Sequence, residues 1–377
     1  MKKIWHLSII FSTILLFLTS CWDQELLKES KLIYGAGFDY ENENEIRTTF
    51  VVRNLGVPVS QGGVYSNRVI SVSGTSPRDT RIKMDRIISK QVTASKNQLI
   101  LLGDEVAKQD IDHMFDILYR DPKSPLDARV AVVEGRAEDV FNLDHIGDTL
   151  ITEFSTNLIK GAENKTEAPR MTVEKAFRYS HDIGQDYAFP YISYNEEVGS
   201  PEINGIALFH QSNFTGVVLP PFDATLLLLM ADAKSKKASI VENIGKQHDQ
   251  GFLTQTVTVN IQNTKSDIKY SFQNGNVSKV FVNLEVRGNI EEYPQDHLFK
   301  ESQVEDIADE LSKKLTERGN DILAKLQEAN CDFLGIGRDL NAYHHELWHP
   351  KQWEKEFPEL NLEAKVKVKI SETGIIK

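Results

Sequence analysis

Alternation of apolar and polar residues is clearest in the second half of the chain. From residue 256, threonine and asparagine alternate with Val257, Val259 and Ile261, and two further alternating runs follow, around residues 268–272 and 280–286. Asn274-Gly275 separates those two runs, and this dipeptide favours a tight hairpin turn. The pattern predicts a β-meander.

A long helix and a last strand are predicted after the meander. Residues 298–329 carry apolar side chains at helical spacing with charged residues opposite, and Gly319 interrupts this run. In residues 360–370, every second residue is apolar, and three lysines occupy alternate positions near its end. A long amphipathic helix laid on a meander, with one further strand, makes an α+β unit.

The first half alternates strand-like and helix-like segments. Strand patterns cover 31–40, 45–53, 67–74, 97–103, 128–135 and 186–194. Helix patterns cover 77–89, 110–121, 145–161 and 172–180, the first of them opened by Ser76-Pro77. This order predicts an α/β-type layered domain.

At 377 residues the chain exceeds the usual size of one core, so several domains are expected. We expect a multi-domain α+β protein with mixed or antiparallel, distorted sheets, each packed with helices. The polar segment 196–202, with Gly199 and Pro201, is the predicted linker between domains at 21–195 and 203–377. A further division near residue 245 would give three small domains.

The N-terminus has the pattern of an export signal. Lys2 and Lys3 precede a short apolar run that ends in Leu18-Thr19-Ser20-Cys21. The run is shorter than a spanning helix needs, which favours a signal peptide of residues 1–20 over an uncleaved membrane anchor. Leu-Thr-Ser-Cys resembles a bacterial lipobox, which implies cleavage between Ser20 and Cys21 and a diacylglyceryl cysteine, with palmitate-type chains, at Cys21. Two acyl chains anchor a protein stably.

Charge and cysteine content limit the function further. The formal charge is −12, which argues against nucleic acid as a partner and against electrostatic binding to anionic lipid. The sequence contains two cysteines. If Cys21 is lipidated, Cys331 has no partner within the chain, so no intramolecular disulfide is expected. Cys331 is predicted to be a small buried side chain rather than a nucleophile.

His345-Glu346-Leu347-Trp348-His349 matches the zinc-protease pattern H-E-x-x-H. Its setting disfavours a zinc site, because glycines lie shortly before it and Pro350 directly follows it. No third ligand has a recognised spacing, although Glu363 and Glu372 are candidates. The alternatives are a catalytic zinc site, incidental surface metal binding, and a short turn or helix that bears aromatic residues; the last is favoured.

Other catalytic patterns are absent from the sequence. It contains no G-x-S-x-G, no G-x-x-x-x-G-K-[ST] and no G-x-G-x-x-G. No catalytic residue, metal ligand or cofactor is therefore predicted.

Over nearly its whole mature length the chain resembles the Ger(x)C family, the C-subunit lipoproteins of spore nutrient-germinant receptors. The resemblance rests on CWDQELLKESKLIYGAGFDY, on LILLGDEVAKQDIDHMFDILYRD, on GIALF with FTGVVL, and on a C-terminal signature from residue 331. The positions that fit are Gly205, Phe209, Gly216, Asp332, Gly335, Gly337, Tyr343, Trp348, Trp353, Phe357 and Gly374. His344 departs from the family, in which a proline commonly follows the tyrosine.

Aromatic residues in this signature also make structural sense by themselves. Trp348, Trp353 and Phe357 are expected to pack the ends of the final strand against the long helix. Tyr343 and Trp348 are expected to be the packing anchors of the YHHELWH segment, with its histidines incidental.

The resemblance implies a non-enzymatic, lipid-anchored subunit on the outer face of the spore inner membrane of a spore-forming Gram-positive bacterium. It would act with two membrane-embedded receptor subunits to trigger germination. The alternative is a substrate-binding lipoprotein of a transporter, which would have two similar α/β lobes around a cleft. A zinc metallopeptidase built on His345, Glu346 and His349 is a distant third.

Overall fold

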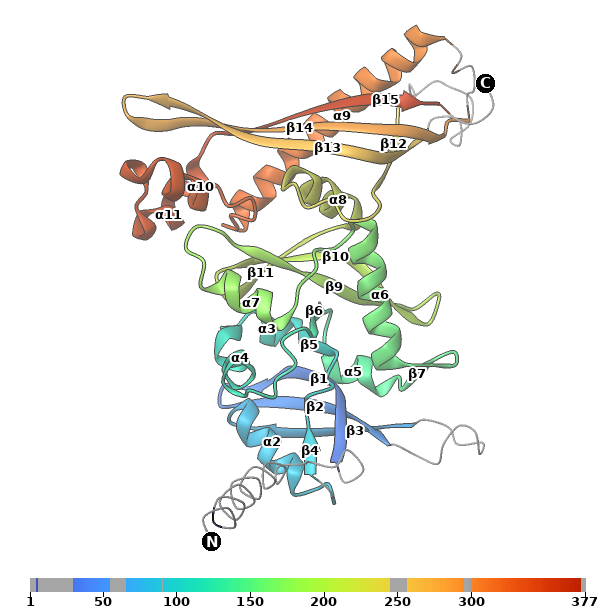
Figure 1. The fold of residues 1–377 in the computed structure, drawn as a ribbon, viewed down its shortest axis with the longest axis vertical. Helices are drawn as coiled ribbons and strands as arrows, with labels where there is room; N and C mark the ends of the chain where they lie inside the picture. The colour runs from blue at the N-terminus through green and yellow to red at the C-terminus, as the bar shows by residue number, and fades with distance from the viewer. Residues whose placement is uncertain are drawn as a thin grey trace.

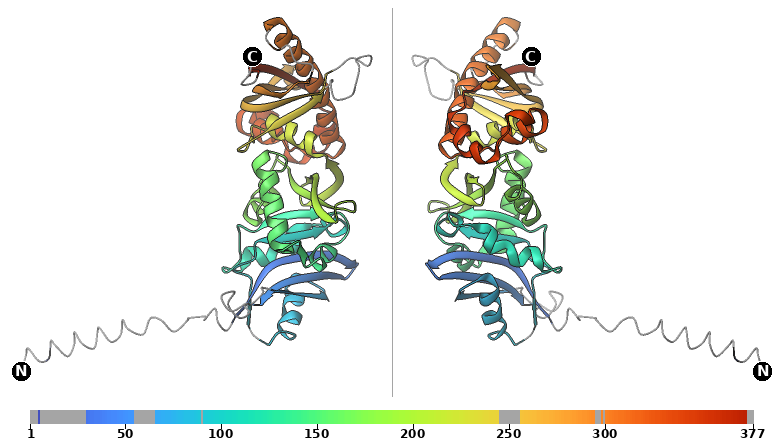
Figure 2. Two further views of the ribbon diagram at one scale, coloured as in Figure 1. Left: turned by 90° about the vertical axis from the view of Figure 1, so that its right-hand side faces the viewer. Right: turned by 90° about the vertical axis from the view of Figure 1, so that its left-hand side faces the viewer.

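The computed structural model describes Trp5 and residues 30–54, 66–89, 91–244, 256–294, 298 and 300–373. Ser20, Cys21 and Gly374, for which lipidation, cleavage or a family position is predicted, lie outside the described residues. The described chain is an elongated stack, with β1–β3 at one end and the C-terminal sheet at the other (Figure 1, Figure 2). None of its described helices has both the length and the apolar character needed to cross a bilayer.

The larger sheet of the described chain has nine strands and mixes parallel with antiparallel pairs. Its order is β11-β10-β9-β6-β5-β1-β2-β3, with β4 beside β1. The strands are β1 (Ser30–Asn42), β2 (Glu45–Asn54), β3 (Ser66–Gly74), β4 (Gln91–Thr93), β5 (Leu99–Gly103), β6 (Arg129–Val133), β9 (Tyr187–Asn195), β10 (Ser200–His210) and β11 (Asn213–Leu219).

Helices cover both faces of this sheet, because its central strands are apolar on both sides. In β5, Ile100 and Leu102 join one core with α4 and α7, whereas Leu99 and Leu101 join another with α5 and α6. The helices are α2 (Pro77–Asp85), α3 (Asp104–Ala107), α4 (Ile111–Arg120), α5 (Ala137–Asn142), α6 (Ile151–Lys165) and α7 (Val173–Ser180).

One segment differs from the sequence-based expectation. Residues 145–150, predicted as helix, form the small hairpin β7 (His145–Ile146) and β8 (Thr149–Leu150) around Gly147, whose φ is +58°. Residues 196–199, at the start of the predicted linker, connect the antiparallel neighbours β9 and β10, and residues 200–202 begin β10. Asn195 Oδ1 accepts bonds from the backbone N–H groups of Glu197 and Val198, so the polar residues here make a turn within one sheet.

The smaller sheet of the described chain has the order β12-β13-β14-β15. Its strands are β12 (Ser239–Asn243), β13 (Thr256–Gln273), β14 (Asn276–Glu292) and β15 (Leu362–Glu372), and α8 (Pro221–Met230) packs against β13 and β14. Asn274 and Gly275 both have positive φ, as their predicted hairpin turn requires. β15 pairs parallel to β14.

Helix α9 (Glu301–Glu328) runs along β15, where three of its polar side chains bind the free edge of that strand. Ser312 Oγ, Thr316 Oγ1 and Asn320 Oδ1 accept hydrogen bonds of 2.9–3.0 Å from the backbone N–H groups of Val368, Val366 and Ala364. The helix thereby satisfies an edge that would otherwise be open for pairing with another chain. At Gly319 an added Cβ would lie 2.9 Å from Cβ of Ala364, so this glycine permits the close approach.

The α+β prediction, with the long helix on the C-terminal strands, is confirmed. A transport-type binding protein would have two similar lobes, but the two sheets here differ in size, strand order and helix cover. The four-stranded sheet has α9 along β15, while helices lie on both faces of the nine-stranded sheet.

Candidate functional site: the aspartate joint between the two sheets

The C-terminal signature places Asp332 at the start of a short helix, α10 (Ile336–Tyr343). Asp332 is 1% exposed, and its Oδ1 accepts a hydrogen bond of 2.9 Å from the N–H of Ile336. Its Oδ2 accepts bonds from the N–H of Gly337, at 2.7 Å, and from Trp353 Nε1, at 3.2 Å. Gly335 precedes the helix with φ +71°, a left-handed conformation that favours glycine. The spacing Asp-x-x-Gly-x-Gly thus builds a buried helix cap.

The environment of Asp332 disfavours its charged form. Burial raises the pKa of Asp332 to about 7, against the lowering effect of the two backbone hydrogen bonds. The nearby carboxylate of Asp186 adds to the upward shift, and the Trp353 hydrogen bond opposes it. This carboxyl group therefore changes its protonation near neutral pH.

Trp348 and Trp353 both pack against Gly337, a glycine of this cap. A Cβ on Gly337 would lie 2.7 Å from ring atoms of both Trp348 and Trp353. The two rings lie 5.1 Å apart between centroids, and Phe357 follows at 5.8 Å from Trp353. Trp353 belongs to α11 (Pro350–Glu356), and Phe357 begins the short 3-10 helix η5 (Phe357–Glu359). All three aromatic residues belong to the core that α9 and β15 share.

Asp186, in the segment before β9, forms hydrogen bonds with Asp332, which lies 146 residues later in the sequence. The N–H of Asp186 donates to the Asp332 carbonyl oxygen at 2.9 Å, and the N–H of Asp332 donates to Asp186 Oδ2 at 2.9 Å. The N–H of Arg338 donates to the Gly184 carbonyl oxygen at 2.8 Å. These bonds connect the larger sheet to the C-terminal helices, and we call them the aspartate joint.

The strand pair β10–β11 supports Asp186 from its other side. Asp186 Oδ1 accepts a bond of 2.7 Å from the N–H of Gln211, and Asp186 Oδ2 lies 3.3 Å from His210 Nδ1. The hydrogen bond to Asp186 raises the pKa of His210, although burial opposes this effect. Sequence analysis did not single out Asp186 or Gly184, because a glycine and an aspartate before a strand indicate only a turn.

Gly205, Phe209 and Gly216 also lie on this strand pair. Gly205 has φ +131° at a bulge of β10, and an added Cβ would lie 2.0 Å from the Leu219 carbonyl oxygen. Gly216 has φ +84° in β11. Phe209 stacks on Tyr187, with 5.4 Å between the ring centroids. The signature residues of this region therefore shape the pair of strands that carries Gln211 and His210.

The H-E-x-x-H residues do not share one helix. His345 begins the 3-10 helix η4 (His345–Leu347), Trp348 is extended, and His349 precedes α11. His345 Nδ1 lies 3.0 Å from Asn341 Oδ1, and Glu363 is paired with Lys279 and Lys365. Within the described ranges, no three His, Cys, Asp or Glu side chains are grouped as metal ligands.

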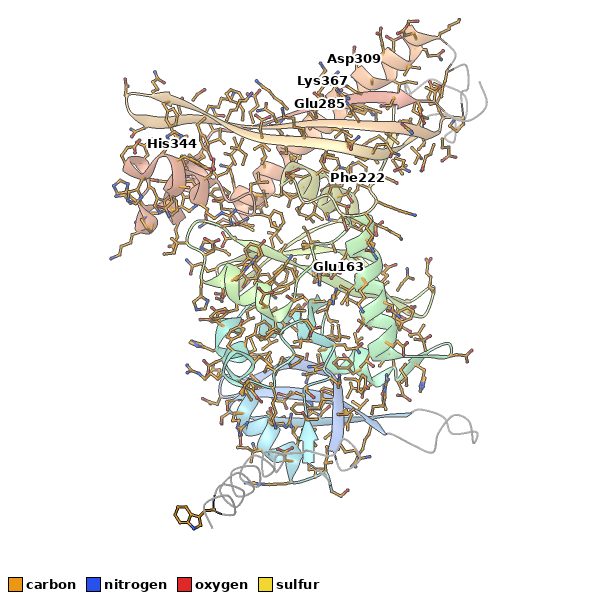
Figure 3. The ribbon with its side chains drawn as sticks, in the orientation of Figure 1. Glu163, Phe222, Glu285, Asp309, His344 and Lys367 are labelled. Atoms are coloured by element: carbon orange, nitrogen blue, oxygen red, sulfur yellow. The ribbon has the colours of Figure 1, made fainter. Side chains whose placement is uncertain are left out.

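Tyr343, expected to pack, is exposed, whereas His344, expected to be incidental, packs against the smaller sheet. Tyr343 is 77% exposed, so the prediction that it anchors the packing is wrong. His344 instead lies against Phe272 and Tyr270 of β13, at centroid distances of 4.8 and 5.7 Å (Figure 3). The reason is helical geometry: α10 buries Ile336 and Leu340, and His344 is one turn beyond Leu340 on the same side.

Cys331, beside Asp332, is completely buried and has no disulfide partner among the described residues. Its Sγ lies 3.8 Å from the Tyr187 carbonyl oxygen. Burial raises the pKa of the Cys331 thiol, and the carboxylates of Asp186 and Asp332 raise it further. A thiol in this environment stays protonated and unreactive.

Two protein-family models match the chain. The spore germination protein N-terminal domain matches residues 23–194, and the spore germination B3/GerAC-like C-terminal domain matches residues 204–374. The chain belongs to the Ger(x)C family of spore germination proteins.

Curated relatives of this Ger(x)C chain include spore germination protein GerQC of Bacillus cereus, 21% identical over 99% of both chains. The putative spore germination protein YfkR of Bacillus subtilis (strain 168) is 21% identical over 100% of this chain and 98% of its own. Spore germination protein A3 of the same strain is 23% identical over 51% of this chain and 52% of its own. The crystal structure of the GerBC protein shares the fold, with a TM-score of 0.58 and 19% identity over 89% of this chain and 96% of its own.

Proposed function

We propose that this Ger(x)C protein is a lipid-anchored, non-enzymatic subunit of a nutrient germinant receptor. It acts with two membrane-embedded subunits on the outer face of the spore inner membrane to trigger germination. The observation that carries the proposal is the match of the family's N- and C-terminal models to both halves of one chain. The names of the relatives GerQC and A3, both spore germination proteins, support it.

The anchor in this proposal is diacylglycerol on Cys21, after cleavage behind Ser20. Support comes from the residues Leu-Thr-Ser-Cys after a short apolar run with two lysines before it. The net charge of −12 makes an electrostatic hold on anionic lipid unfavourable, so the lipid supplies the binding.

The absence of catalysis in this proposal is supported by the geometry of the joint. Asp332 is the buried carboxylate of the C-terminal signature. It accepts hydrogen bonds from three donors and is 1% exposed. A group that reacts with a substrate must be reachable by it. Asp332 therefore serves the fold, and we assign the protein a role in assembly and signal transfer.

The test uses metabolic labelling with a palmitate analogue in sporulating cells that carry Cys21→Ala, and Cys331→Ser as the matched cysteine control. Label is expected in the wild-type and Cys331→Ser proteins and is expected to be missing from Cys21→Ala. The Cys21→Ala protein should also leave the spore membrane fraction, and nutrient-triggered germination should fall. Unchanged membrane binding and germination in Cys21→Ala would refute the anchored role.

Partner subunits are tested by isolating the tagged chain from detergent-solubilised spore inner membranes. Two multi-pass membrane proteins are expected to co-purify in stable proportion and to remain bound in the His345→Ala/His349→Ala variant. Recovery of the chain without any multi-pass protein would refute the receptor assembly.

A further inference from the structure

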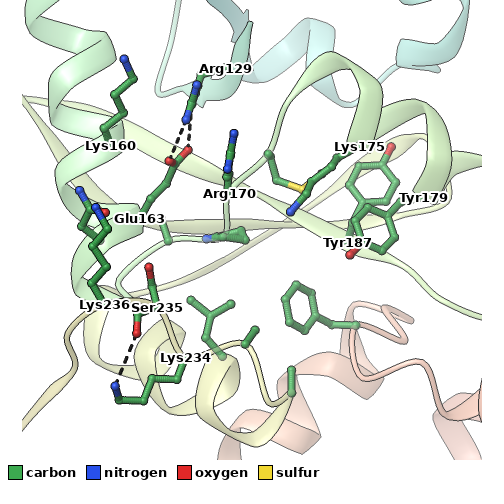
Figure 4. A pocket seen from close by; sticks show the side chains of 18 of the residues that line it. Arg129, Lys160, Glu163, Arg170, Lys175, Tyr179, Tyr187, Lys234, Ser235 and Lys236 are labelled. Atoms are coloured by element: carbon green, nitrogen blue, oxygen red, sulfur yellow. Dashed lines mark hydrogen bonds and ion pairs between the residues drawn. The ribbon is translucent and has the colours of Figure 1, made fainter. Parts of the chain in front are cut away.

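A pocket of about 650 Å³ lies beside the aspartate joint, between α6, α7 and the loop 231–236 that follows α8 (Figure 4). Its volume falls within the range of sites that bind small molecules. Lys175, Tyr179 and Tyr187 lie on one side of the pocket, Lys160, Glu163 and Lys236 lie on the other, and Arg129 and Arg170 lie between the two groups.

The pocket is basic although the chain as a whole is acidic. Its lining includes six cationic residues but only two acidic residues. Both acidic residues already have partners: Glu163 pairs with Arg129 within the pocket, and Asp186 belongs to the joint. Across the described residues, no carboxylate is in ion-pair contact with the remaining five cations, which are Lys160, Arg170, Lys175, Lys234 and Lys236.

The charge around Lys175 favours an anionic ligand. Burial lowers the pKa of Lys175, and the positive charges of Arg170 and Arg178 lower it further. The carboxylates of Glu163 and Glu174 oppose this shift only in part. A further negative charge beside Lys175 would therefore be favourable.

The loop that carries Lys234 and Lys236 is fixed in place. Thr166 Oγ1 accepts a bond of 3.0 Å from the N–H of Ser235 and donates one of 2.6 Å to the Lys237 carbonyl oxygen. The N–H of Lys237 also donates to the Asn164 carbonyl oxygen, at 2.9 Å. Because the loop backbone is held against the end of α6, binding of an anion has to order only the side chains of its two lysines.

We propose that this pocket binds a small soluble organic anion that carries two or more carboxylate or phosphate groups. One anionic group lies between Arg170 and Lys175. A second group lies near Lys160 and Lys236. The proposal is independent of the receptor role, since it rests on the pocket alone.

The test is calorimetric titration of the full-length protein, purified in detergent, with citrate and with pyrophosphate at constant ionic strength. Both anions are expected to bind the wild type. The Arg170→Gln/Lys175→Gln variant should bind at least about tenfold more weakly, because it loses charge-assisted hydrogen bonds. The control is Lys96→Gln/Lys313→Gln, which removes equal charge from two exposed positions outside the pocket and should keep wild-type affinity.

The thermal unfolding midpoint separates binding from folding. Arg170 and Lys175 have no ion-pair partner among the described residues, so the midpoint of the free Arg170→Gln/Lys175→Gln protein should not fall. If neither anion binds the wild type at millimolar concentration, or if both double variants lose affinity equally, the proposal is overturned.

Phosphate groups also occur on lipid headgroups, and a second arm distinguishes that source. The protein is reconstituted into phosphatidylcholine vesicles with and without phosphatidylglycerol, and citrate binding is measured again. A site for a free anion keeps its affinity in both preparations. Loss of citrate binding only with phosphatidylglycerol would overturn the assignment to a soluble ligand.

Discussion

Asp186 and Asp332 hold each other by two reciprocal hydrogen bonds, each 2.9 Å long, across 146 residues of sequence. The first residue leads into β9 of the larger sheet, and the second leads into the helices that pack under the smaller sheet. This pair explains why the C-terminal signature begins with an aspartate: its backbone connects the sheets, while its side chain caps α10. The joint thereby adds hydrogen bonds between the regions of the two sheets, which form one elongated stack (Figure 1).

Asp332 should make the stability of the protein depend on pH. Its folded-state pKa of about 7 lies above the unfolded value, so its contribution to stability is complete in acid and is lost as the pH rises toward and through 7. Thermal unfolding midpoints of the wild type and of Asp332→Asn, measured from pH 4 to pH 8, should therefore differ by an amount that changes with pH. A difference that is constant over this range would contradict the buried, neutralised carboxyl group.

Trp353→Phe should lose a specific hydrogen bond. The indole Nε1 donates to Asp332 Oδ2, and bonds to a charged or partly charged group contribute about 1.5–3 kcal/mol. Trp348→Phe is the matched control, since it also replaces an indole ring that packs against Gly337 by a smaller phenyl ring. We expect chemical denaturation to show a larger loss of unfolding free energy for Trp353→Phe, by about 1 kcal/mol or more. Equal losses would mean that the lost ring volume alone explains the change in unfolding free energy in both variants.

Gly337→Ala should be strongly unfavourable. Its Cβ would meet two tryptophan rings at 2.7 Å, and overpacking of a rigid core costs about 1–3 kcal/mol. Gly161→Ala in α6 provides the comparison, because nothing lies within 4 Å of its Cβ position. That control should be neutral or stabilising by about 0.5–1 kcal/mol, as alanine favours a helix. Both free energies can be read from urea unfolding curves.

Thr316→Val should loosen the edge of β15. The Thr316 hydroxyl accepts a hydrogen bond from the N–H of Val366, which valine cannot replace. Hydrogen exchange at the Val366 amide should accelerate, while the neighbouring Lys365 amide, which alternates toward β14, should keep its protection. Unchanged exchange at Val366 would show that this helix–strand bond is not needed to close the edge.

Asp223→Asn should weaken the attachment of α8 to α9. Asp223 is 4% exposed, and Arg318 and Lys325 of α9 bond its two oxygens at 2.7 and 2.8 Å. Burial would raise the pKa of Asp223, but the bonds from Lys325 and Arg318 outweigh burial and hold this pKa below its usual value. The carboxylate thus stabilises the protein above its unfolded pKa, and this stability is lost as the pH falls through its lowered folded pKa. The deficit of Asp223→Asn in unfolding free energy should be present at pH 7 and should shrink in acid.

Local chemistry explains which features the sequence could predict. The Asn274-Gly275 hairpin and the amphipathic repeat of α9 depend on residues close together in the sequence, so the sequence predicts both. The polar, glycine-containing composition of residues 196–202 predicts a boundary there, but only the pairing of β9 with β10 shows that the strands on its two sides belong to one sheet. Asp186 could not be found, because its partner lies 146 residues away. The inversion of Tyr343 and His344 has a similar origin, since β13 supplies the surface against which His344 packs.

Nutrient-triggered germination of spores that carry either of two variants tests the central claim most directly. One variant is His345→Ala/His349→Ala, and the other is Asp332→Ala, each measured together with the amount of the protein in the spore membrane. The account predicts near-normal germination for the histidine variant. For Asp332→Ala, which removes the side chain that caps α10 beside the joint, it predicts a large loss of both protein and germination. Normal protein levels with lost germination in the histidine variant would contradict the account, because the two histidines would then act chemically.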